Sequence, residues 1–530
     1  MHQRLYGAEK SSSLNLAQRT LSGIFWAYAS FIGGRLLNVV TTAILARLLF
    51  PEDFGLIGFA TLLISFIEVS YGLGINDALV YTSERVDDAA STTFWINIAV
   101  GAVQTTFLFL AAPLTLKFFE DPRIVDVVRV MSLTFVVSSF GFTHDALLQK
   151  ELEFKRRFIP DLISSFIKGT ASIVMALSGV GVWSLVIGHL IGTVARVIAK
   201  WWVMRWVPQF RFYTDRAKEL WGYGVHILLF ELLNVVLEQA DQLLIGTMLG
   251  ALQLGYYAIA AKIPEMVIAN FSLILTRVIF PTFAKMKDDL DQLTRGFLMT
   301  TKYTAFVTIP AGFGLAAVAP EVIRVIYGSK WDDSIIIMQV LALLGMTATL
   351  PWSAGDVLKA VGRPDVSTKL LVIESLYTFP LIYLFVTQQR LAVSASLANL
   401  VALNITTVLR LYVISRFLEI SPLVFVRVFR SSLFGGVSVF VMVSFWRMLL
   451  EGLPLLVILI TSILLGAVVY AIIMWMLERE DILQMRETLT ATLRRKRDDS
   501  DDDSESQSGD ETPGEIEKTV LPSASSTAEL

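Results

Sequence analysis

Apolar segments of about 20 residues recur along almost the whole chain, and this is the length that an α-helix needs to cross the hydrocarbon core of a membrane. They lie near residues 22–46, 54–76, 91–113, 125–147, 158–179, 182–204, 219–246, 253–280, 294–319, 334–358, 367–387, 391–415, 432–450 and 454–477. This pattern predicts an all-α integral membrane protein with about 14 transmembrane helices.

The composition agrees with this interpretation. Of the 530 residues, 54% are hydrophobic and 17% are charged, whereas about 25% are charged in soluble globular proteins. The absence of cysteine excludes disulfides, thiolate metal sites and a cysteine nucleophile. The four histidines show no metal-ligand spacing, and no phosphate-binding glycine loop is present. We therefore expect no metal, no other cofactor and no enzymatic activity.

Charge is distributed unevenly along the chain. Residues 498–530 hold eleven acidic side chains and one lysine, and this polar segment is predicted to be disordered. The remaining chain is basic overall, although the formal net charge is -3. If the N-terminus is cytoplasmic, the loops on that side collect about 29 Lys and Arg and the opposite loops about seven. We therefore expect a multi-pass protein of the cytoplasmic membrane with both termini in the cytoplasm.

An internal repeat indicates two similar halves. Residues 45–60 and 245–260 share a pattern at an offset of about 200 residues, in which Gly55 matches Gly255. Because six helices separate the two copies, both halves should point the same way across the membrane. Two parallel six-helix lobes followed by two additional helices are therefore predicted.

The predicted organisation has six parts. They are a cytoplasmic N-terminal segment at 1–21, a first lobe at 22–204, a cytoplasmic linker at 205–218, a second lobe at 219–415, two additional transmembrane helices at 416–477, and a cytoplasmic, acidic, disordered tail at 478–530.

Four segments, in order along the chain, resemble the Wzx-like polysaccharide flippases. They are residues 44–55 (ILARLLFPEDFG), 147–157 (LLQKELEFKRR), 241–257 (DQLLIGTMLGALQLGYY) and 362–364 (GRP). This family belongs to a superfamily that includes multidrug and toxin extrusion transporters and the peptidoglycan-precursor flippase. The resemblance implies two helical bundles that carry a polyprenyl-pyrophosphate-linked oligosaccharide from the inner to the outer leaflet by alternating access, for surface polysaccharide or lipopolysaccharide assembly.

Such a cargo requires a cationic, hydrated cavity for its pyrophosphate, since charges within membrane spans are costly unless they face water or a partner. The substrate-binding candidates are Arg35, Lys168, Arg196, Lys262 and Arg277. Three of them have a structural alternative. Arg35 would pair with Glu68, Lys262 would pair with Glu265 three residues away, and Arg277 would reach the cytoplasmic interface.

Carboxylates within the spans are candidates for binding a coupling ion, H⁺ or Na⁺. The ion-coupling candidates are Glu68, Glu231, Glu238 and Asp241, of which the last three share roughly one helical face. Charge balance within the bundle is the alternative. Asp145 and Asp356 occupy matching repeat positions and are predicted to be gate or loop residues.

Three other functions remain open at this point. An ion-coupled multidrug exporter would need an acidic cavity, which the Arg and Lys residues in the spans disfavour. A membrane enzyme of polysaccharide biosynthesis would need a larger extracytoplasmic loop than this chain offers. A non-transporting scaffold would bind the substrate without moving it. Expected partners are the lipid-linked oligosaccharide, membrane lipids, a coupling ion and a polysaccharide polymerase or export protein, but not nucleic acid.

Overall fold

The computed structural model describes residues 33–68, 76, 79–80, 85–151, 153–211, 213, 235–269, 279, 282–480 and 483. Within these residues the chain is helical and contains no β-strand, and eleven helices are long and apolar enough to cross a membrane. The all-α membrane fold is thus confirmed, while the count of 14 stays a prediction. The predictions for Arg277, Glu231, the segment at 1–21 and the tail beyond residue 483 concern residues outside the described part of the chain.

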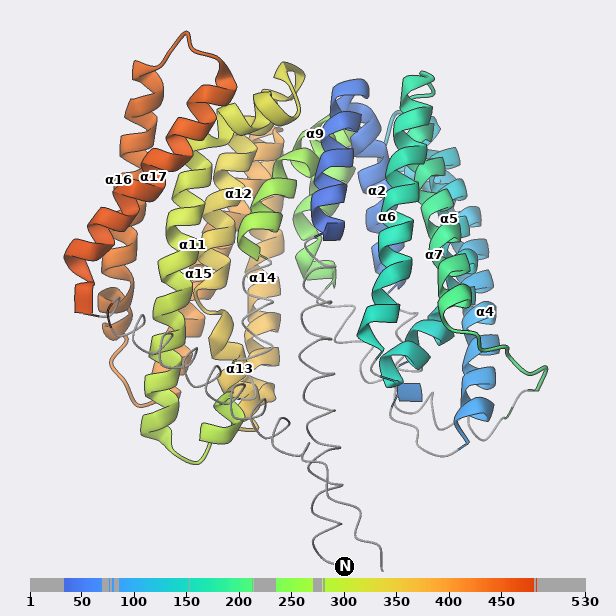
Figure 1. Cartoon of the computed structure of the whole chain (residues 1–530), viewed down its shortest axis with the longest axis horizontal. Coiled ribbons are helices and arrows are strands. Elements are labelled where there is room, and N and C mark those ends of the chain that lie inside the picture. Colours follow the sequence, from blue (N-terminus) through green and yellow to red (C-terminus); the bar gives the residue numbers. More distant parts are fainter. Residues whose placement is uncertain are drawn as a thin grey trace, which may run out of the picture. The chain divides into compact units, whose positions relative to one another are not determined.

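Most of the described helices are labelled in Figure 1. After a helix at 33–48 they are α2 (Pro51–Glu68), α4 (Val86–Ala111), η2 (Ala112–Lys117), α5 (Arg123–Lys150), α6 (Phe154–Leu177), α7 (Trp183–Val203), α9 (Ala240–Pro264), η3 (Glu265–Ala269), α11 (Leu290–Ile326), η4 (Ser329–Trp331), α12 (Asp333–Thr349), α13 (Trp352–Ala360), α14 (Pro364–Gln389), α15 (Ala392–Phe417), α16 (Val424–Leu449) and α17 (Leu455–Leu477).

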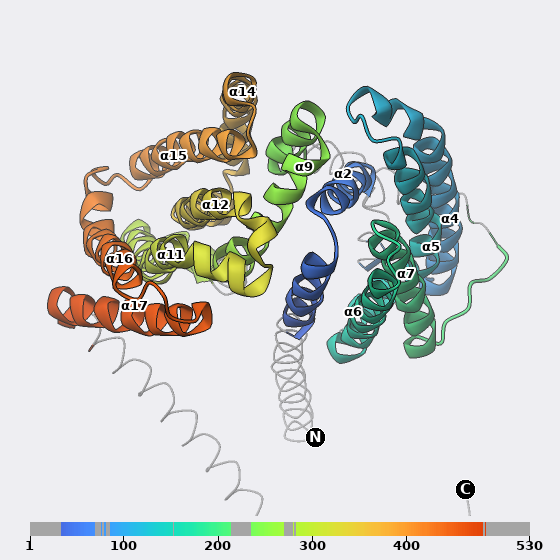
Figure 2. The same ribbon diagram turned by 90° about the horizontal axis from the view of Figure 1, so that it is seen from above.

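Two groups of helices can be distinguished by their contacts within residues 1–470 (Figure 2). In the N-terminal group, α5 packs against α2, α4, α6 and α7. In the C-terminal group, α11, α12, α14 and α15 pack around one another, and α9 joins them. The contact between α2 and α9 connects the two groups. Residues 471–530 form a separate unit, whose described part is the end of α17 and a few residues beyond.

Glycine allows α2 and α9 to approach closely. A Cβ atom at Gly55 would lie 1.8 Å from the carbonyl oxygen of Ala251, and one at Gly255 would lie 1.9 Å from that of Pro51. These four positions form two pairs at the repeat offset of 200 residues. The contact is therefore reciprocal, as two halves related by a two-fold axis require, and it supports the predicted repeat.

The structure differs from the predicted helices at two places. The seventh and eighth segments are joined by a kink at Gly250 inside α9, not by a loop, because the φ angle of 80° there is accessible to glycine. The tenth segment is divided into α12 and α13 next to Pro351. Proline cannot donate a backbone hydrogen bond, so a helix breaks readily at this residue.

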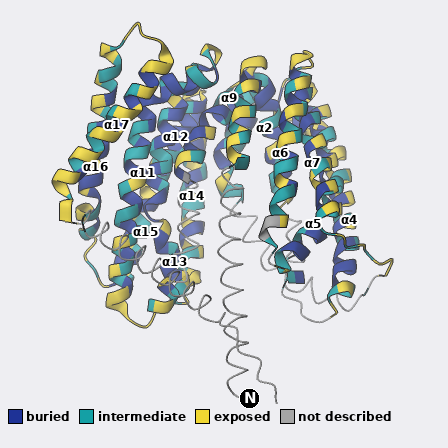
Figure 3. Ribbon diagram, viewed as in Figure 1, coloured by how far each residue is buried: buried dark blue, intermediate teal, exposed yellow. Residues whose placement is uncertain are grey.

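Prolines within α11 provide attachment points for α17 and α12. Pro310 leaves the carbonyl of Phe306 without its helical donor, and the Tyr470 hydroxyl of α17 donates to that oxygen at 2.7 Å. Pro320 likewise frees the carbonyl of Ala316, which accepts from a side-chain amide of α12 at 3.1 Å. Figure 3 shows that α11 and α12 are largely buried, whereas α16 and α17 carry many exposed residues.

Candidate functional site

Arg47 and Lys330 connect the two groups at the end of the helices where α2 begins. Arg47 donates from Nε to the carbonyl of Ile326 at 3.1 Å and also bonds the carbonyl of Val325, the last carbonyls of α11. Lys330 donates to the carbonyl of Arg47 at 3.0 Å and to that of Leu49, at the end of the helix at 33–48. Each group therefore supplies a cation to the negative, unsatisfied end of a helix in the other group.

Trp331 seals this contact. Its side chain is fully buried, and its indole Nε1 donates to the carbonyl of Ala46 at 2.9 Å. Its ring lies edge-on to Phe54 of α2, with 5.4 Å between the centroids. We call Arg47, Lys330 and Trp331 the clamp. Partial burial lowers the pKa of Lys330, and the nearby carboxylate of Asp53 opposes this shift.

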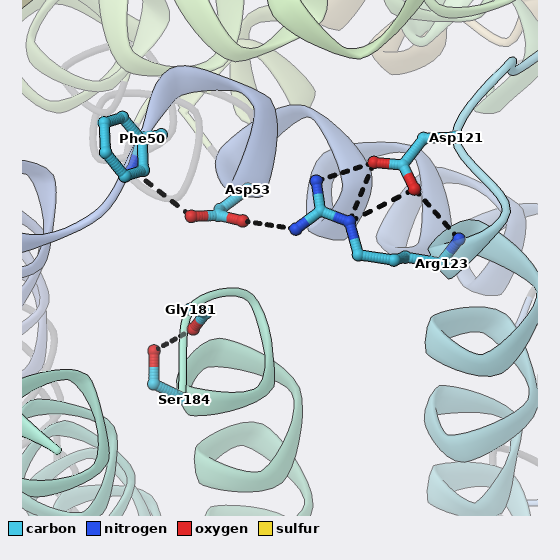
Figure 4. Close-up of polar contacts among 6 residues, drawn as sticks. All are labelled: Phe50, Asp53, Asp121, Arg123, Gly181 and Ser184. Atoms are coloured by element: carbon cyan, nitrogen blue, oxygen red, sulfur yellow. Dashed lines mark hydrogen bonds and ion pairs between the residues drawn. The ribbon is translucent and has the colours of Figure 1, made fainter. Parts of the chain in front are cut away.

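Asp53 lies near Lys330 of the clamp and also binds residues of the N-terminal group, which Figure 4 shows as Phe50 and Arg123. It accepts from the backbone N–H of Phe50 at 3.2 Å, which caps the start of α2, and lies 3.4 Å from the guanidinium of Arg123. Arg123 also binds Asp121 at 2.6 Å, and this hydrogen bond lowers the pKa of Asp121. The first turn of α2 is thereby fixed to the start of α5.

Positively charged side chains of three helices gather away from the clamp. Lys168 of α6 lies within electrostatic range of Arg196 of α7 and of Lys262 of α9. Arg196 is paired with Asp161 at 3.3 Å, and it also acts on Glu68 at the end of α2. The structure thus brings together three of the predicted cationic candidates, and Lys262 comes from the other helix group.

A second cluster connects the far ends of α5, α6 and α7. Asp145 accepts from Arg157 at 2.9 and 3.2 Å and pairs with Lys200 at 3.3 Å. Next to it, His144 is buried, with its ring 4.6 Å from the ring of Trp201. Asp145 thus joins three helices, an arrangement that suits the predicted gate or loop role.

Asp241 is a buried carboxylate in α9. It accepts from the Tyr257 hydroxyl, from the backbone N–H of Gln242 at 2.7 Å, and from the side-chain amide of Asn399 in α15 at 3.2 Å. These donors are all neutral, so they stabilise a negative charge without cancelling it. Such a group can bind a proton or a small cation.

The other described candidates lie elsewhere in the fold. Arg35 is exposed on the helix at 33–48, and Glu238 is exposed just before α9. Asp356 is buried in α13. The clamp was not predicted, because its acceptors are backbone carbonyls, which leave no signature in the sequence. A sequence signal for Trp331 exists only in hindsight, as an aromatic residue beside Lys330 in a short connection.

Comparison with known proteins agrees with this architecture. Residues 44–336 match the family described as polysaccharide biosynthesis protein. The chain is 28% identical over 355 residues to the teichuronic acid biosynthesis protein TuaB of Bacillus subtilis, covering 67% of this chain and 74% of that protein. It is 25% identical over 402 residues to the lipopolysaccharide biosynthesis protein WzxC of Escherichia coli, covering 76% and 82%.

Solved structures share the fold at low sequence identity. The lipid II flippase MurJ, in an inward closed conformation, aligns with a TM-score of 0.70 and 17% identity over 87% of this chain and all of that one. An inward-facing multidrug transporter of the MATE family aligns with a TM-score of 0.60 and 16% identity, covering 73% and 95%.

Proposed function

The chain belongs to the polysaccharide biosynthesis protein family, and from this premise we propose that it is a flippase for an oligosaccharide linked to a polyprenyl (pyro)phosphate. Relatives named for teichuronic acid and lipopolysaccharide biosynthesis, and a structural neighbour named as a lipid II flippase, support this assignment. The cargo would move from the inner to the outer leaflet of the cytoplasmic membrane, with both termini of the chain in the cytoplasm.

The observation that carries the proposal is the cationic cluster of Lys168, Arg196 and Lys262. Lys168 lies within electrostatic range of Arg196 on α7 and of Lys262 on α9, which belongs to the other helix group, and all three are in membrane helices. Their mutual repulsion is relieved when an anion binds among them, and a pyrophosphate carries the charge that this requires. A transporter of cationic drugs would be disfavoured by the same cluster, and the transport cycle calls for no covalent chemistry.

Alternating access follows from the clamp in this proposal. The clamp closes the space between the groups at one end, so the cargo enters from the other end. Opening requires the hydrogen bonds of Arg47 and Lys330 to break, while the glycine contact between α2 and α9 provides the crossing point. A coupling ion, H⁺ or Na⁺, would bind at Asp241 and supply the energy for the cycle. A polymerase or export protein would accept the product.

Transport in liposomes tests the function. The purified chain is reconstituted with a fluorescent lipid-pyrophosphate oligosaccharide, and flipping is followed by the accessibility of the label. We expect transport by the wild type and a loss of at least about tenfold in Lys168→Gln. Arg35→Ala, run in parallel, decides whether Arg35 joins the cationic site or has a structural role. Absence of transport by the folded wild type would overturn the proposal.

A further inference from the structure

Three of the five ionisable residues of α6 share one face of the helix, and so do the three of α7. On α6 they are Arg157, Asp161 and Lys168, at steps of four and seven residues. On α7 they are His189, Arg196 and Lys200, at steps of seven and four residues. Steps of four and seven return to the same side of an α-helix. We call these six residues the α6–α7 track.

Small residues hold the two helices close enough for the track to be continuous. A Cβ atom at Gly192 would lie 2.7 Å from that of Lys168, and one at Gly188 would lie 1.9 Å from the hydroxyl oxygen of Ser172. The Ser164 hydroxyl donates to the carbonyl of Gly192 at 2.8 Å. Figure 2 shows α6 and α7 side by side, as these contacts require.

The track consists of three successive levels. At the end where α6 begins, Asp145 holds Arg157 and Lys200. One turn further into the bundle, Asp161 holds Arg196. Deeper still, His189 lies within electrostatic range of Lys168 and Arg196.

Exposure shows that the middle level is accessible to solvent. The side chain of Asp161 is 61% exposed and that of Arg196 is 48% exposed, although both lie within membrane helices. Charged groups that faced hydrocarbon would be strongly destabilised, so this face borders water. The exchange of one anion for another at Arg196 therefore needs no further desolvation of buried groups.

The C-terminal group has the same spacing with a different charge. Asn399, Thr406 and Arg410 of α15 repeat the spacing of His189, Arg196 and Lys200 at an offset of 210 residues. Their partners are Asp241 for Asn399, Tyr377 for Thr406, and Glu374 for Arg410 at 2.7 Å. Glu374 is only 12% exposed and Arg410 33%, so this pair is the less accessible one.

The balance of charge decides between the two faces. The α6–α7 track and Asp145 together contain four cations and two carboxylates. The matching face of α15 and its partners contain one cation and two carboxylates. Only the N-terminal face has the surplus of positive charge that a polyanion would neutralise.

We propose that the α6–α7 track positions the phosphate groups of the cargo on their way to Lys168, with Asp145 and Asp161 as substitute anions that the phosphates displace. This inference rests on the proposed function and deepens it. Arg157, Lys200 and Arg196 are each held in place by a carboxylate in the empty protein, so they are oriented for a phosphate without being left unpaired. Arg157, Lys200 and Asp161 then determine the affinity for the headgroup without any role in coupling.

Binding of inorganic pyrophosphate to the full chain in nanodiscs tests the inference, by titration calorimetry at low salt. Arg196→Gln removes a phosphate ligand and is expected to weaken binding about fivefold. Asp161→Asn removes the competing anion and is expected to strengthen binding about fivefold. Arg410→Gln is the control in the C-terminal group, since Arg410 is also an arginine paired with a carboxylate but occupies the position of α15 that matches Lys200, and its affinity should equal that of the wild type.

These measurements can overturn the role of the α6–α7 track and the flippase function independently of each other. Equal effects of Arg196→Gln and Arg410→Gln, or no gain in Asp161→Asn, would overturn the track even if the wild type flips its cargo. The three predicted affinities in a protein that flips no lipid-linked oligosaccharide would support an anion site and overturn the flippase. Because Asp161→Asn is expected to gain affinity, misfolding cannot mimic the supporting result.

Discussion

The faces of α7 and α15 carry polar residues at the same spacing but differ in charge and in access to solvent. The first presents His189, Arg196 and Lys200, with a half-exposed ion pair at Arg196. The second presents Asn399, which binds the buried carboxylate of Asp241. In the predicted repeat, these positions are thus kept while their chemistry differs. We interpret this difference as a division of roles, with the anionic cargo on the N-terminal side and the coupling cation on the C-terminal side.

Substitution of the paired glycines is expected to have the largest effect, a loss in the free energy of unfolding. It tests whether the two halves are equivalent in their packing. Gly55→Ala places a methyl group against the backbone of α9, and Gly255→Ala places one against the backbone of α2. Each should lower the free energy of unfolding by about 3 kcal/mol. Thermal unfolding of the purified protein measures this loss.

The control for this pair is Gly58→Ala, whose Cβ would lie 3.8 Å from the side chain of Leu254, an ordinary contact. It should unfold like the wild type. If Gly255→Ala behaves like Gly58→Ala while Gly55→Ala does not, the reciprocal packing of α2 and α9 is wrong.

Asp241→Asn tests the role assigned to the C-terminal group. The amide keeps the shape of the side chain but removes the charge that a coupling cation would neutralise, so flipping should fall at least about tenfold. Binding of pyrophosphate should remain within about twofold of the wild type, since Asp241 is not part of the track. Asp126→Asn, at an exposed carboxylate of α5, is the control and should transport normally. Loss of pyrophosphate affinity in Asp241→Asn would contradict the division of roles.

Variants of the clamp test whether the two helix groups contribute equally to closure. Their expected effect is smaller than that of Asp241→Asn. Arg47→Gln and Lys330→Gln each remove the charge that satisfies a helix end, and each should shift the ratio of closed to open molecules three- to tenfold, about 1 kcal/mol. The chain has no cysteine, so spin labels at introduced cysteines in place of Phe50 and Ser329 report the opening directly.

The double variant at Arg47 and Lys330 should open more than either single variant, since the two cations act on different helix ends. Arg363→Gln is the control, because Arg363 binds Asp365 at 3.0 Å between α13 and α14, away from the clamp. Label distances that stay unchanged in the double variant would show that these hydrogen bonds do not hold the groups together.

The smallest effect concerns Asp121 beside the clamp. Its hydrogen bond with Arg123 lowers its pKa in the folded protein, so the ionised form is favoured by folding. The contribution of this hydrogen bond to stability is complete at pH values above the usual pKa of an aspartate. It is lost as the pH falls through the lowered pKa of Asp121. Solvent screening keeps it below about 1 kcal/mol. Unfolding temperatures between about pH 5 and pH 3 should decline more steeply in the wild type than in Asp121→Asn, and equal slopes would exclude the effect.

Much of the fold could be predicted from the sequence because membrane helices need long apolar segments, and the starts of α5, α7 and α15 lie within a few residues of the expected positions. Lys168, Arg196 and Lys262 could be identified from the sequence for a similar reason. A charged side chain within a membrane span is costly, so it is expected to face water, a partner or a ligand.

Contacts between segments far apart in the chain could not be predicted from the sequence. The bond between Asn399 and Asp241 joins residues 158 positions apart. Lys330 binds backbone carbonyls near residue 48, which any sequence would present. The repeat offset of α7 and α15 became visible only when the partners of Arg196 and Arg410 were known. The role of a polar residue depends more on its hydrogen-bond or ion-pair partner in the fold than on its residue type.

In the proposed cycle, the α6–α7 track recognises the anionic group of the cargo. The most direct measurement compares flipping of one glycan attached to a polyprenyl pyrophosphate with flipping of the same glycan attached to an uncharged polyprenol, in liposomes with wild-type protein, Arg196→Gln or Arg410→Gln. We expect at least about tenfold faster flipping of the pyrophosphate form by the wild type and by Arg410→Gln, and a much smaller preference in Arg196→Gln. Equal rates for the two lipids in the wild type would contradict it.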